Sequence, residues 1–391
     1  MKWITIALAL GLMVGAASHA AAKPLKVFIL AGQSNMQGHA NVSTLDSMAN
    51  DPKTAPILKE MCNADGTPRV CQRVWISSVG CAGDGWSDVI EQTGKLTTGF
   101  GASPSEIGPE LTFGIYMENA LGEPILLIKT AWGGRSLHTD FRPPSAGPYV
   151  WGDFELARPE ERREDVEKQK AEKIKDTGVF YRHMIEHVKK VVADLKRVVP
   201  EYDPQQGYEL AGFVWFQGWN DLVSTWTYPN NNYDEYGRLL EMFIRDVRKD
   251  LSAPKMPFVI GVIGVGGEKA GADIQALRRA QVAPTLLPEF QGNVAAVPTA
   301  PYWDDELDAL QQRIEKFNAK MDQEAKKNPG LSQAAKDEAR KKTLAGSFTP
   351  EELRLLMGLS NGGYHYLGAA KILAPIGKAF AEAMMNLQKT R

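Results

Sequence analysis

The sequence predicts an α/β fold in which a five-stranded parallel sheet is covered by helices on both faces. Two observations lead to this prediction. Five short apolar segments rich in β-formers recur along the chain, and amphipathic helical patterns lie between them. Strands that alternate with helices favour a parallel sheet with right-handed crossover connections. We therefore expect a three-layer α/β/α sandwich.

The predicted strands and helices are defined by their apolar patterns. The strands are expected at residues 26–31, 124–130, 210–216, 257–263 and 293–298. The helices are expected at residues 110–120, 179–198, 233–250 and 274–287, with a last amphipathic run at 366–387. Short apolar runs indicate buried strands, and apolar residues at helical spacing indicate helices.

The N-terminus has the pattern of a secretory signal peptide. Lys2 precedes an apolar run over residues 4–17, and small residues follow up to Ala22. A basic start, a short apolar core and a small-residue cleavage site are typical of such a leader. The apolar run is too short to span a membrane comfortably. We expect residues 1–22 to be removed and the protein to be exported, to the periplasm or the outside of the cell.

The remaining chain has ordinary globular composition, because 43% of the 391 residues are hydrophobic and 24% are charged. We expect a single domain over residues 23–391 with polar helical insertions at about 157–175 and 305–356. The second insertion should break near residues 328–330 and start a new helix at the cap near 349–352. Alternating charges of this kind usually form solvated helix faces.

The net charge limits the partners that the chain can attract, and the cysteines limit the disulfide and metal sites that it can form. A formal net charge of −2 gives no global field that would attract nucleic acid or anionic lipid. Cys62, Cys71 and Cys81 lie in one loop region, and an exported chain permits one disulfide among them. The pairing stays open, and a metal site built from the three thiolates lacks C-x-x-C spacing.

Ser34 follows the end of the first predicted strand by two residues. The strand ends at Gly32, which lets the backbone turn sharply. Ligands of open α/β sheets bind just beyond the carboxyl ends of the strands. Ser34 therefore stands where a nucleophile would meet a substrate, with its own N–H near a helix start. The alternative is that Ser34 only caps that helix.

Polar groups also follow the next two strands. Gly133 and Gly134 allow backbone N–H groups to approach a bound oxygen, as an oxyanion hole requires; a plain Gly-Gly turn is the alternative. Gln217 and Asn220 can donate side-chain N–H bonds to a developing oxyanion, and Asp221 could orient a base. A simple turn around Asn220 is the alternative there.

His365 precedes the last helix on a Gly-Gly loop, where it has the freedom to reach a serine. An early serine with a late histidine suits a hydrolase in which the base activates a weak hydroxyl nucleophile. A merely solvated loop histidine is the alternative.

Together these motifs form a recognisable set. The chain resembles the SGNH hydrolase superfamily, and within it the sialate O-acetylesterase-like and carbohydrate esterase family six group. The stretches that carry the resemblance are residues 32–38, 108–111, 132–136, 217–220 and 364–366. The resemblance extends from about residue 26 to the last helix, apart from the two polar insertions.

The resemblance implies a flavodoxin-like sandwich and a serine carboxylic-ester hydrolase that removes acetyl groups from sugar hydroxyls. Ser34 looks like the nucleophile and His365 like the base. The oxyanion hole would consist of the Ser34 N–H, a glycine N–H at Gly133 or Gly134, and Gln217 supported by Asn220. The substrate-binding residues expected in these motifs are Gln33, Trp132, Arg135 and Trp219. Glu110 looks like a structural brace under the site.

Two departures from the family pattern leave the third triad member open. The family usually places an aspartate three residues before the histidine, where this chain has Gly362. Some relatives use a glutamate after the Gln-Gly pair, where this chain has Trp219. Asp221 is the leading candidate by proximity in sequence. The alternative is a Ser–His dyad in which a backbone carbonyl orients the imidazole.

We therefore expect an exported acetylesterase, of the sialate O-acetylesterase or acetylxylan esterase kind, that acts on acetylated oligo- or polysaccharides without a metal or organic cofactor. One rival is a non-catalytic carbohydrate-binding protein on an esterase scaffold. Another is a zinc peptidase, because His183 and His187 fit an H-x-x-E-H pattern. The regular apolar stripe of the same helix indicates that it packs on the sheet, which argues against a zinc site. The oligomeric state stays open.

Overall fold

The computed structural model describes residues 23–81, 89–152, 155–157, 165–224, 227–328, 330 and 332–389. The expected signal peptide, residues 1–22, lies outside these ranges. Within them, no helix is long and apolar enough to cross a membrane. Cys62, Cys71 and Cys81 are all free thiols.

A seven-stranded sheet with the order β4-β3-β6-β1-β7-β8-β9 forms the centre of the molecule. The five expected strands are confirmed as β1 (Leu25–Gly32), β6 (Ile125–Ala131), β7 (Tyr208–Phe216), β8 (Phe258–Val262) and β9 (Val294–Pro298). Strand β1 pairs in parallel with both β6 and β7 and is buried between them. The carboxyl ends of these three strands therefore lie at one edge of the sheet.

Two further strands extend the sheet beyond the expected five. Strand β3 (Val74–Val79) is parallel to β6, and β4 (Glu91–Lys95) is antiparallel to β3 at the edge. Two serines interrupt the apolar run of β3, and β4 is wholly polar apart from one glycine. An edge strand faces solvent on one side and needs little apolar surface. A small antiparallel pair joins β2 (Ala40–Asn41) and β5 (Glu106–Ile107).

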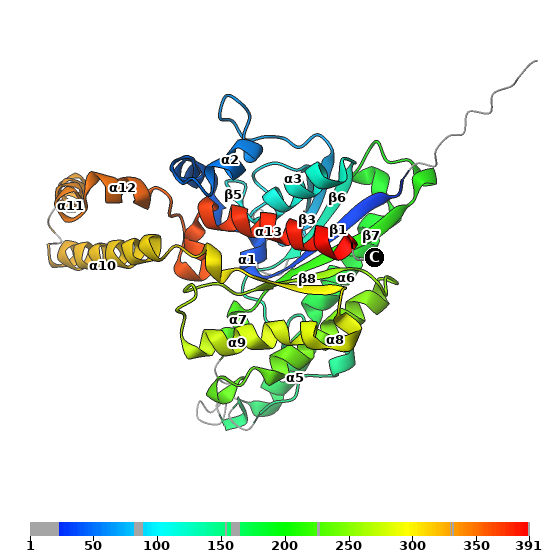
Figure 1. Ribbon diagram of the computed structural model, residues 1–391. Helices are drawn as coiled ribbons and strands as arrows, with labels where there is room; N and C mark the ends of the chain where they lie inside the picture. Colours follow the sequence, from blue (N-terminus) through cyan, green and yellow to red (C-terminus); the bar gives the residue numbers. More distant parts are fainter. Residues whose placement is uncertain are drawn as a thin grey trace, which may run out of the picture.

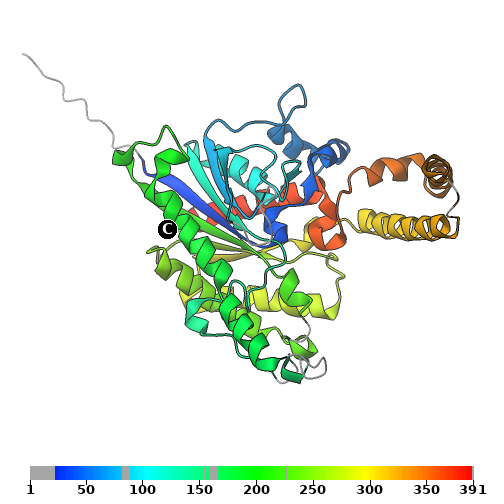
Figure 2. The same cartoon turned by 180° about the vertical axis from the view of Figure 1, so that it is seen from behind.

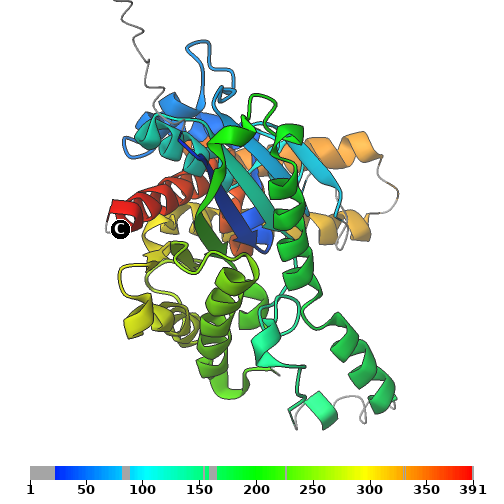
Figure 3. The same cartoon turned by 90° about the vertical axis from the view of Figure 1, so that its right-hand side faces the viewer.

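Helices cover both faces of the sheet, so the three-layer sandwich is confirmed. On one face, α3 (Pro109–Leu121) and α13 (Ala370–Lys389) pack closely together. On the other lie α6 (Val179–Ala193), α8 (Asp234–Asp250) and α9 (Ala272–Val282). Figure 3 shows α13 in red on one side of the strands and α6 in green on the other. The last helix starts at Ala370 rather than at 366, because Gly363–Gly368 form the turn η9.

The polar segments predicted as insertions are helical. Helices α10 (Asp305–Lys327), α11 (Gln333–Ser347) and α12 (Pro350–Leu356) project from the body of the molecule (Figures 1 and 2), and we call them the helical arm. Thr349 and Glu352 form a complete capping box at the start of α12. The described part of the other insertion contains α5 (Val166–Asp176).

Short helices complete the fold. They are α1 (Ser34–Gln37), α2 (Ala55–Met61) and α7 (Trp219–Leu222), together with 3₁₀ segments such as η1 (Val42–Asn50). Helix α1 follows β1 directly, and Gly32 makes this turn possible. Its φ is +155°, and a Cβ at this position would lie 2.1 Å from the carbonyl oxygen of Phe216. The strand therefore delivers Ser34 to the carboxyl edge of the sheet through a turn that only glycine fits.

Candidate active site

Ser34 is the first residue of α1 at the carboxyl end of the central strand. The N–H groups of Met36 and Gln37 bond to the carbonyl of Gln33, whereas the first N–H groups of a helix have no acceptor within it. The N–H of Ser34 can therefore serve an outside oxygen. Gly133 is close by, because a Cβ on Gly133 would lie 4.0 Å from the Cβ of Ser34. The ends of β1 and β6 thus bring these two expected residues together.

His365 lies in η9, which packs directly against α1. The residues after it, Tyr366 and Leu367, are fully buried and adopt left-handed backbone conformations with φ of 54° and 62°. Such conformations are costly for bulky residues unless the surroundings enforce them. The Tyr366 hydroxyl accepts from the N–H of Gly264 at 2.7 Å and is 2.7 Å from Thr299 Oγ1. Anchoring below the turn thus holds His365 at the same rim as Ser34.

Asn361 orients the imidazole of His365. Its Oδ1 is 3.0 Å from His365 Nδ1 and also accepts from the N–H of Gly362 at 2.8 Å. The backbone donor fixes the amide with its oxygen towards the ring. An acceptor at Nδ1 requires a proton there, so the other ring nitrogen, Nε2, is the acceptor that a general base needs.

A second histidine lies face to face with the first. The rings of His39 and His365 stack with their centroids 3.9 Å apart and their planes within 5°. Glu106 Oε1 is 3.6 Å from His39 Nδ1. The pKa of His365 is lowered to about 3, chiefly by burial and next by His39, while Glu106 acts in the opposite direction. His365 is therefore neutral over the physiological pH range.

Asp221 does not orient His365, so this expectation is corrected. The carboxylate is fully buried and accepts four hydrogen bonds, from the N–H groups of Leu137 and His138, from Gln217 Nε2 and from the Tyr228 hydroxyl. Burial raises the pKa of Asp221 to about 6, against the effect of these donors. Both oxygens hold the loop after β6 in place, and Asn361 occupies the position at Nδ1.

Gln33 connects the strand ends instead of contacting substrate. Its Oε1 accepts three bonds of 3.1 Å, from Gln217 Nε2 and from the N–H groups of Gly218 and Asn220. Its Nε2 donates to Asn220 Oδ1 at 2.9 Å and is 3.4 Å from Ser34 Oγ. The side chain is completely buried. The structure therefore gives Gln33 a supporting role and not the expected substrate-binding one.

The expected oxyanion donors form two groups: side-chain amides that bond to other protein groups, and backbone N–H groups near Ser34. Gln217 Nε2 is within 2.6 to 3.1 Å of three protein acceptors and its Oε1 accepts from Tyr236, so this amide is committed to the network. Asn220 Nδ2 donates to the Gly134 carbonyl at 2.8 Å. These two amides brace the loop after β6, which differs from the direct role expected of Gln217. The N–H groups of Ser34 and Gly133 are the donors best placed beside the nucleophile.

The two tryptophans expected to bind substrate lie in different environments, one in the core and one near the surface. Trp132 is fully buried and packs edge-on against Phe180 at 5.3 Å, so it is a core residue. Trp219 is half-buried, and its ring centroid is 5.9 Å from that of Tyr364, which is 46% exposed. These two rings form an aromatic rim beside His365. Trp226, a further aromatic residue that follows the third predicted strand, lies outside the described residues.

The expected substrate contact Arg135 lies at the edge of the same loop. Its guanidinium is 4.1 Å from the ring centroid of Phe180, and its Nη1 is 3.5 Å from Asp140 Oδ1. The side chain is 21% exposed. Arg135 is thus held by neighbours while part of it faces solvent.

A buried ion pair forms the floor under α1. Lys129 Nζ is 2.7 Å from Glu110 Oε2, and both side chains are completely buried. Lys129 also donates to the carbonyls of Gln37 and Phe100 at 2.6 Å each, and Glu110 Oε1 accepts from the N–H of Gly108. Glu110 is therefore the structural brace that was expected, tied to the helix that carries Ser34.

The H-x-x-E-H pattern of α6 does not converge on one point. His187 Nε2 is 2.9 Å from Ser77 Oγ on strand β3, and His183 Nδ1 is 3.9 Å from Glu186. Among the described residues, no group of three or more His, Cys, Asp or Glu side chains could hold a metal ion.

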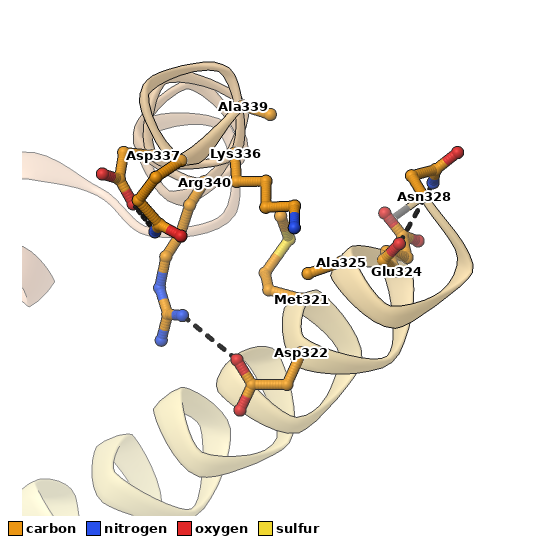
Figure 4. A pocket seen from close by; sticks show the side chains of 10 residues that line it. Met321, Asp322, Glu324, Ala325, Asn328, Lys336, Asp337, Ala339 and Arg340 are labelled. Carbon is orange, nitrogen blue, oxygen red and sulfur yellow. Dashed lines mark hydrogen bonds and ion pairs between the residues drawn. The ribbon is translucent and has the colours of Figure 1, made fainter. Parts of the chain in front are cut away.

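Several hollows lie away from Ser34 and His365, and two of them are lined by ion-paired side chains. One, of about 380 Å³, is between α10 and α11 in the helical arm, where Arg340 reaches Asp322 at 3.3 Å (Figure 4). The other, of about 450 Å³, lies beside the start of α13, where Lys371 joins Asp51 and Asp304. Neither is lined by a residue of the expected site.

Sequence reasoning missed Asn361 and His39. Asn361 is four residues before His365, one position away from the usual aspartate, and a polar side chain there was the available signal. His39 directly follows the serine motif. His39 stacks on His365, which is more than 300 positions later in the chain, so the residues around His39 gave no indication of this contact.

A family model described as "Carbohydrate esterase, sialic acid-specific acetylesterase" matches residues 24–306. No curated protein matches the sequence. A solved structure of a protein from Arabidopsis thaliana is 18% identical, with 71% of this chain and 86% of that chain covered and a TM-score of 0.37. A carbohydrate acetylesterase from Xanthomonas citri is 14% identical, with 70% and 49% covered and a TM-score of 0.40.

This chain spans about half the length of the Xanthomonas protein. At these TM-scores, the two solved structures do not indicate what this chain does. The family model covers well over half of the chain and ends before most of the helical arm and before η9. It confirms the resemblance seen in the four motifs at residues 32–38, 108–111, 132–136 and 217–220, whereas the fifth motif, at 364–366, lies beyond the matched residues. The chain belongs to the carbohydrate esterase family of sialic acid-specific acetylesterases.

Proposed function

We propose that this protein is an exported carbohydrate O-acetylesterase that works through a Ser34–His365 acyl-enzyme mechanism. One observation carries the proposal. The start of α1 and the turn η9 pack together, and the imidazole on η9 is neutral with its Nδ1 held by Asn361. A nucleophile, an oriented base and free backbone donors are the parts that acyl transfer requires.

In the first half of the reaction, Ser34 Oγ attacks the acetyl carbon and its proton moves to His365 Nε2. The carbonyl oxygen becomes an oxyanion beside the N–H groups of Ser34 and Gly133. The bond between the acetyl carbon and the sugar oxygen then breaks, and His365 returns the proton to the sugar hydroxyl. In the second half, His365 takes a proton from water, and the resulting hydroxide attacks the acetyl carbon of the acetyl-serine. The bond between the acetyl carbon and Ser34 Oγ then breaks, acetate leaves, and His365 returns the proton to Ser34 Oγ.

The aromatic rim supports a sugar as the alcohol part of the ester. Trp219 and Tyr364 present ring faces next to the base, and flat apolar faces suit stacking on sugar rings. Family membership supports an acetylated carbohydrate as substrate. The N-terminal leader pattern supports export to the periplasm or the medium, and a mature protein that starts near Lys23 would test it.

The defining experiment compares acetate release from p-nitrophenyl acetate and acetylated xylan by the wild type, Ser34→Ala and His365→Ala. We expect both variants to lose activity by about 10³-fold or more. Intact turnover by Ser34→Ala would refute the proposed nucleophile. The neutral Asn361 in place of a triad acid also suits the rival non-catalytic carbohydrate-binding protein, which would bind glycans without releasing acetate.

A further inference from the structure

We infer that Gln311, on helix α10 of the helical arm, is a positioning residue that aims His365 by holding Asn361. The inference rests on the proposed function, because it concerns the base of that mechanism. Its basis is a hydrogen bond between the arm and the loop that carries the base. Gln311 Nε2 donates to the backbone carbonyl of Asn361 at 2.9 Å.

Gln311 is itself held in place. Its side chain is 8% exposed, and the same Nε2 is 3.0 Å from Glu315 Oε1 on the next turn of α10. These two acceptors define the orientation of the amide. The contact with Asn361 is therefore made by an ordered side chain and not by a solvent-exposed one that samples many rotamers.

The bond completes the fixation of Asn361. The N–H of Asn361 donates to the Leu367 carbonyl at 3.2 Å, and its side-chain oxygen faces His365 Nδ1. Gln311 holds the remaining backbone group, the carbonyl. Gly362 and Gly363 follow directly, and glycines give a loop little stiffness of its own. The direction in which Asn361 points thus depends on its hydrogen bonds.

Side-chain contacts join α10 to α12 and to the residue before its N-cap at the base of the helical arm. Arg313 forms an ion pair with Glu352 of α12 and lies 5.0 Å from the ring centroid of Phe348. Phe317 packs edge-on against Phe348 at 5.9 Å. The chain leaves the body through α10 and returns through α12 towards Asn361, and Gln311 closes this loop. If the contact with Gln311 is lost and Asn361 Oδ1 shifts by a fraction of an ångström, the imidazole of His365 is oriented less well.

The test uses Gln311→Glu, which keeps the shape of the side chain but replaces the donor with an oxygen. We expect kcat on p-nitrophenyl acetate to fall about tenfold, because the new oxygen cannot donate to the Asn361 carbonyl and is repelled by it and by Glu315, so that Asn361 orients His365 less well. KM should change less than twofold. Gln312→Ala is the matched control, because Gln312 is exposed and its hydrogen-bond partner among the described residues is Asp308 on its own helix. Its kcat should stay at the wild-type value.

A double-mutant cycle shows whether Gln311 acts through Asn361. In the Asn361→Ala background, Gln311→Glu should lower kcat no further. An unchanged kcat in the single variant, or an equal further loss in the Asn361→Ala background, would overturn the inference. Loss of activity in Ser34→Ala alongside either result would show that the proposed function stands and only the role of Gln311 fails.

Nitrogen-15 NMR of labelled histidines gives a readout that needs no turnover. In the wild type we expect a protected Nδ1 proton on His365, and in Gln311→Glu a faster exchange of that proton. Identical exchange in the two proteins would overturn the inference even if the wild type releases no acetate. Thermal melting of both proteins checks that the variant is folded.

Discussion

An amide, not a carboxylate, orients the base of this site. Asn361 offers His365 Nδ1 an acceptor without a negative charge, which stabilises the imidazolium less than a carboxylate would. Asparagine in this position occurs in other nucleophile–histidine sites. The family pattern predicts an aspartate three residues before His365 as the residue that orients the base, and proximity in sequence predicts Asp221 for this role. The partner could not be read from the sequence, because only the folded turn shows which side chain faces the ring.

Asn361→Asp should raise the pKa of His365, since a carboxylate beside the ring favours its charged form. A base loses activity as it becomes protonated, so the acid limb of kcat/KM should move to higher pH by about one unit or more. The wild type should remain active at pH 5, because the pKa of its base is about 3. Steady-state kinetics between about pH 2.5 and pH 9 measure the acid limbs of both proteins. Coincident acid limbs would contradict this role of Asn361.

Tyr364→Ala should weaken binding of polymeric substrate. The exposed ring loses its stacking face, so KM for acetylated xylan should rise about two- to tenfold, while the constants for p-nitrophenyl acetate stay within twofold. Tyr364→Phe keeps the face and is the matched control. Equal effects on both substrates would mean that Tyr364 supports the site and does not bind sugar.

Among the elements, those with strong apolar periodicity were predictable and those defined by tertiary partners were not. Strand β1 and helix α8 lie within a residue or two of their expected bounds. Strand β4 was missed because its polar sequence is stabilised by pairing with β3 at the edge. Residues 366–368 at the end of η9 were expected to belong to the last helix, because their apolar side chains continue its pattern although they are buried anchors in a strained loop.

The floor of the site offers a prediction about one ion pair. Glu110→Ala leaves the ammonium of Lys129 buried with only carbonyl partners, which should lower the free energy of unfolding by about 3–5 kcal/mol. Urea denaturation at pH 7 measures this. Glu167→Ala is a matched control, because its partner Lys170 is at the surface and such pairs contribute about 0–1 kcal/mol. Similar losses in both variants would contradict the bracing role of Glu110.

Across the whole molecule, burial keeps several histidines neutral. The pKa values of His138 and His365 are lowered to about 3 and that of His187 to about 4, in each case chiefly by burial. The unfolded chain takes up protons on these rings below about pH 6.5 and the folded chain does not. Their contribution to stability is therefore complete above pH 6.5 and is lost as the pH falls towards 3 or 4.

The urea midpoint should accordingly fall between pH 7 and pH 4.5. Asp221 acts in the opposite direction, because its pKa is raised to about 6 and its stabilising effect is lost as the pH rises through that value. One such group offsets only part of the effect of three histidines. His187→Gln should make the pH dependence shallower. A midpoint that is the same at both pH values would show that these rings are protonated in the folded state.

The most direct measurement is covalent labelling by a fluorophosphonate, followed by mass spectrometry of the labelled peptide. The wild type should take up one equivalent of label on Ser34, His365→Ala should react far more slowly, and Ser34→Ala should not react. Label on another residue, or no label at a concentration that saturates known serine esterases, would contradict a nucleophilic Ser34 activated by His365.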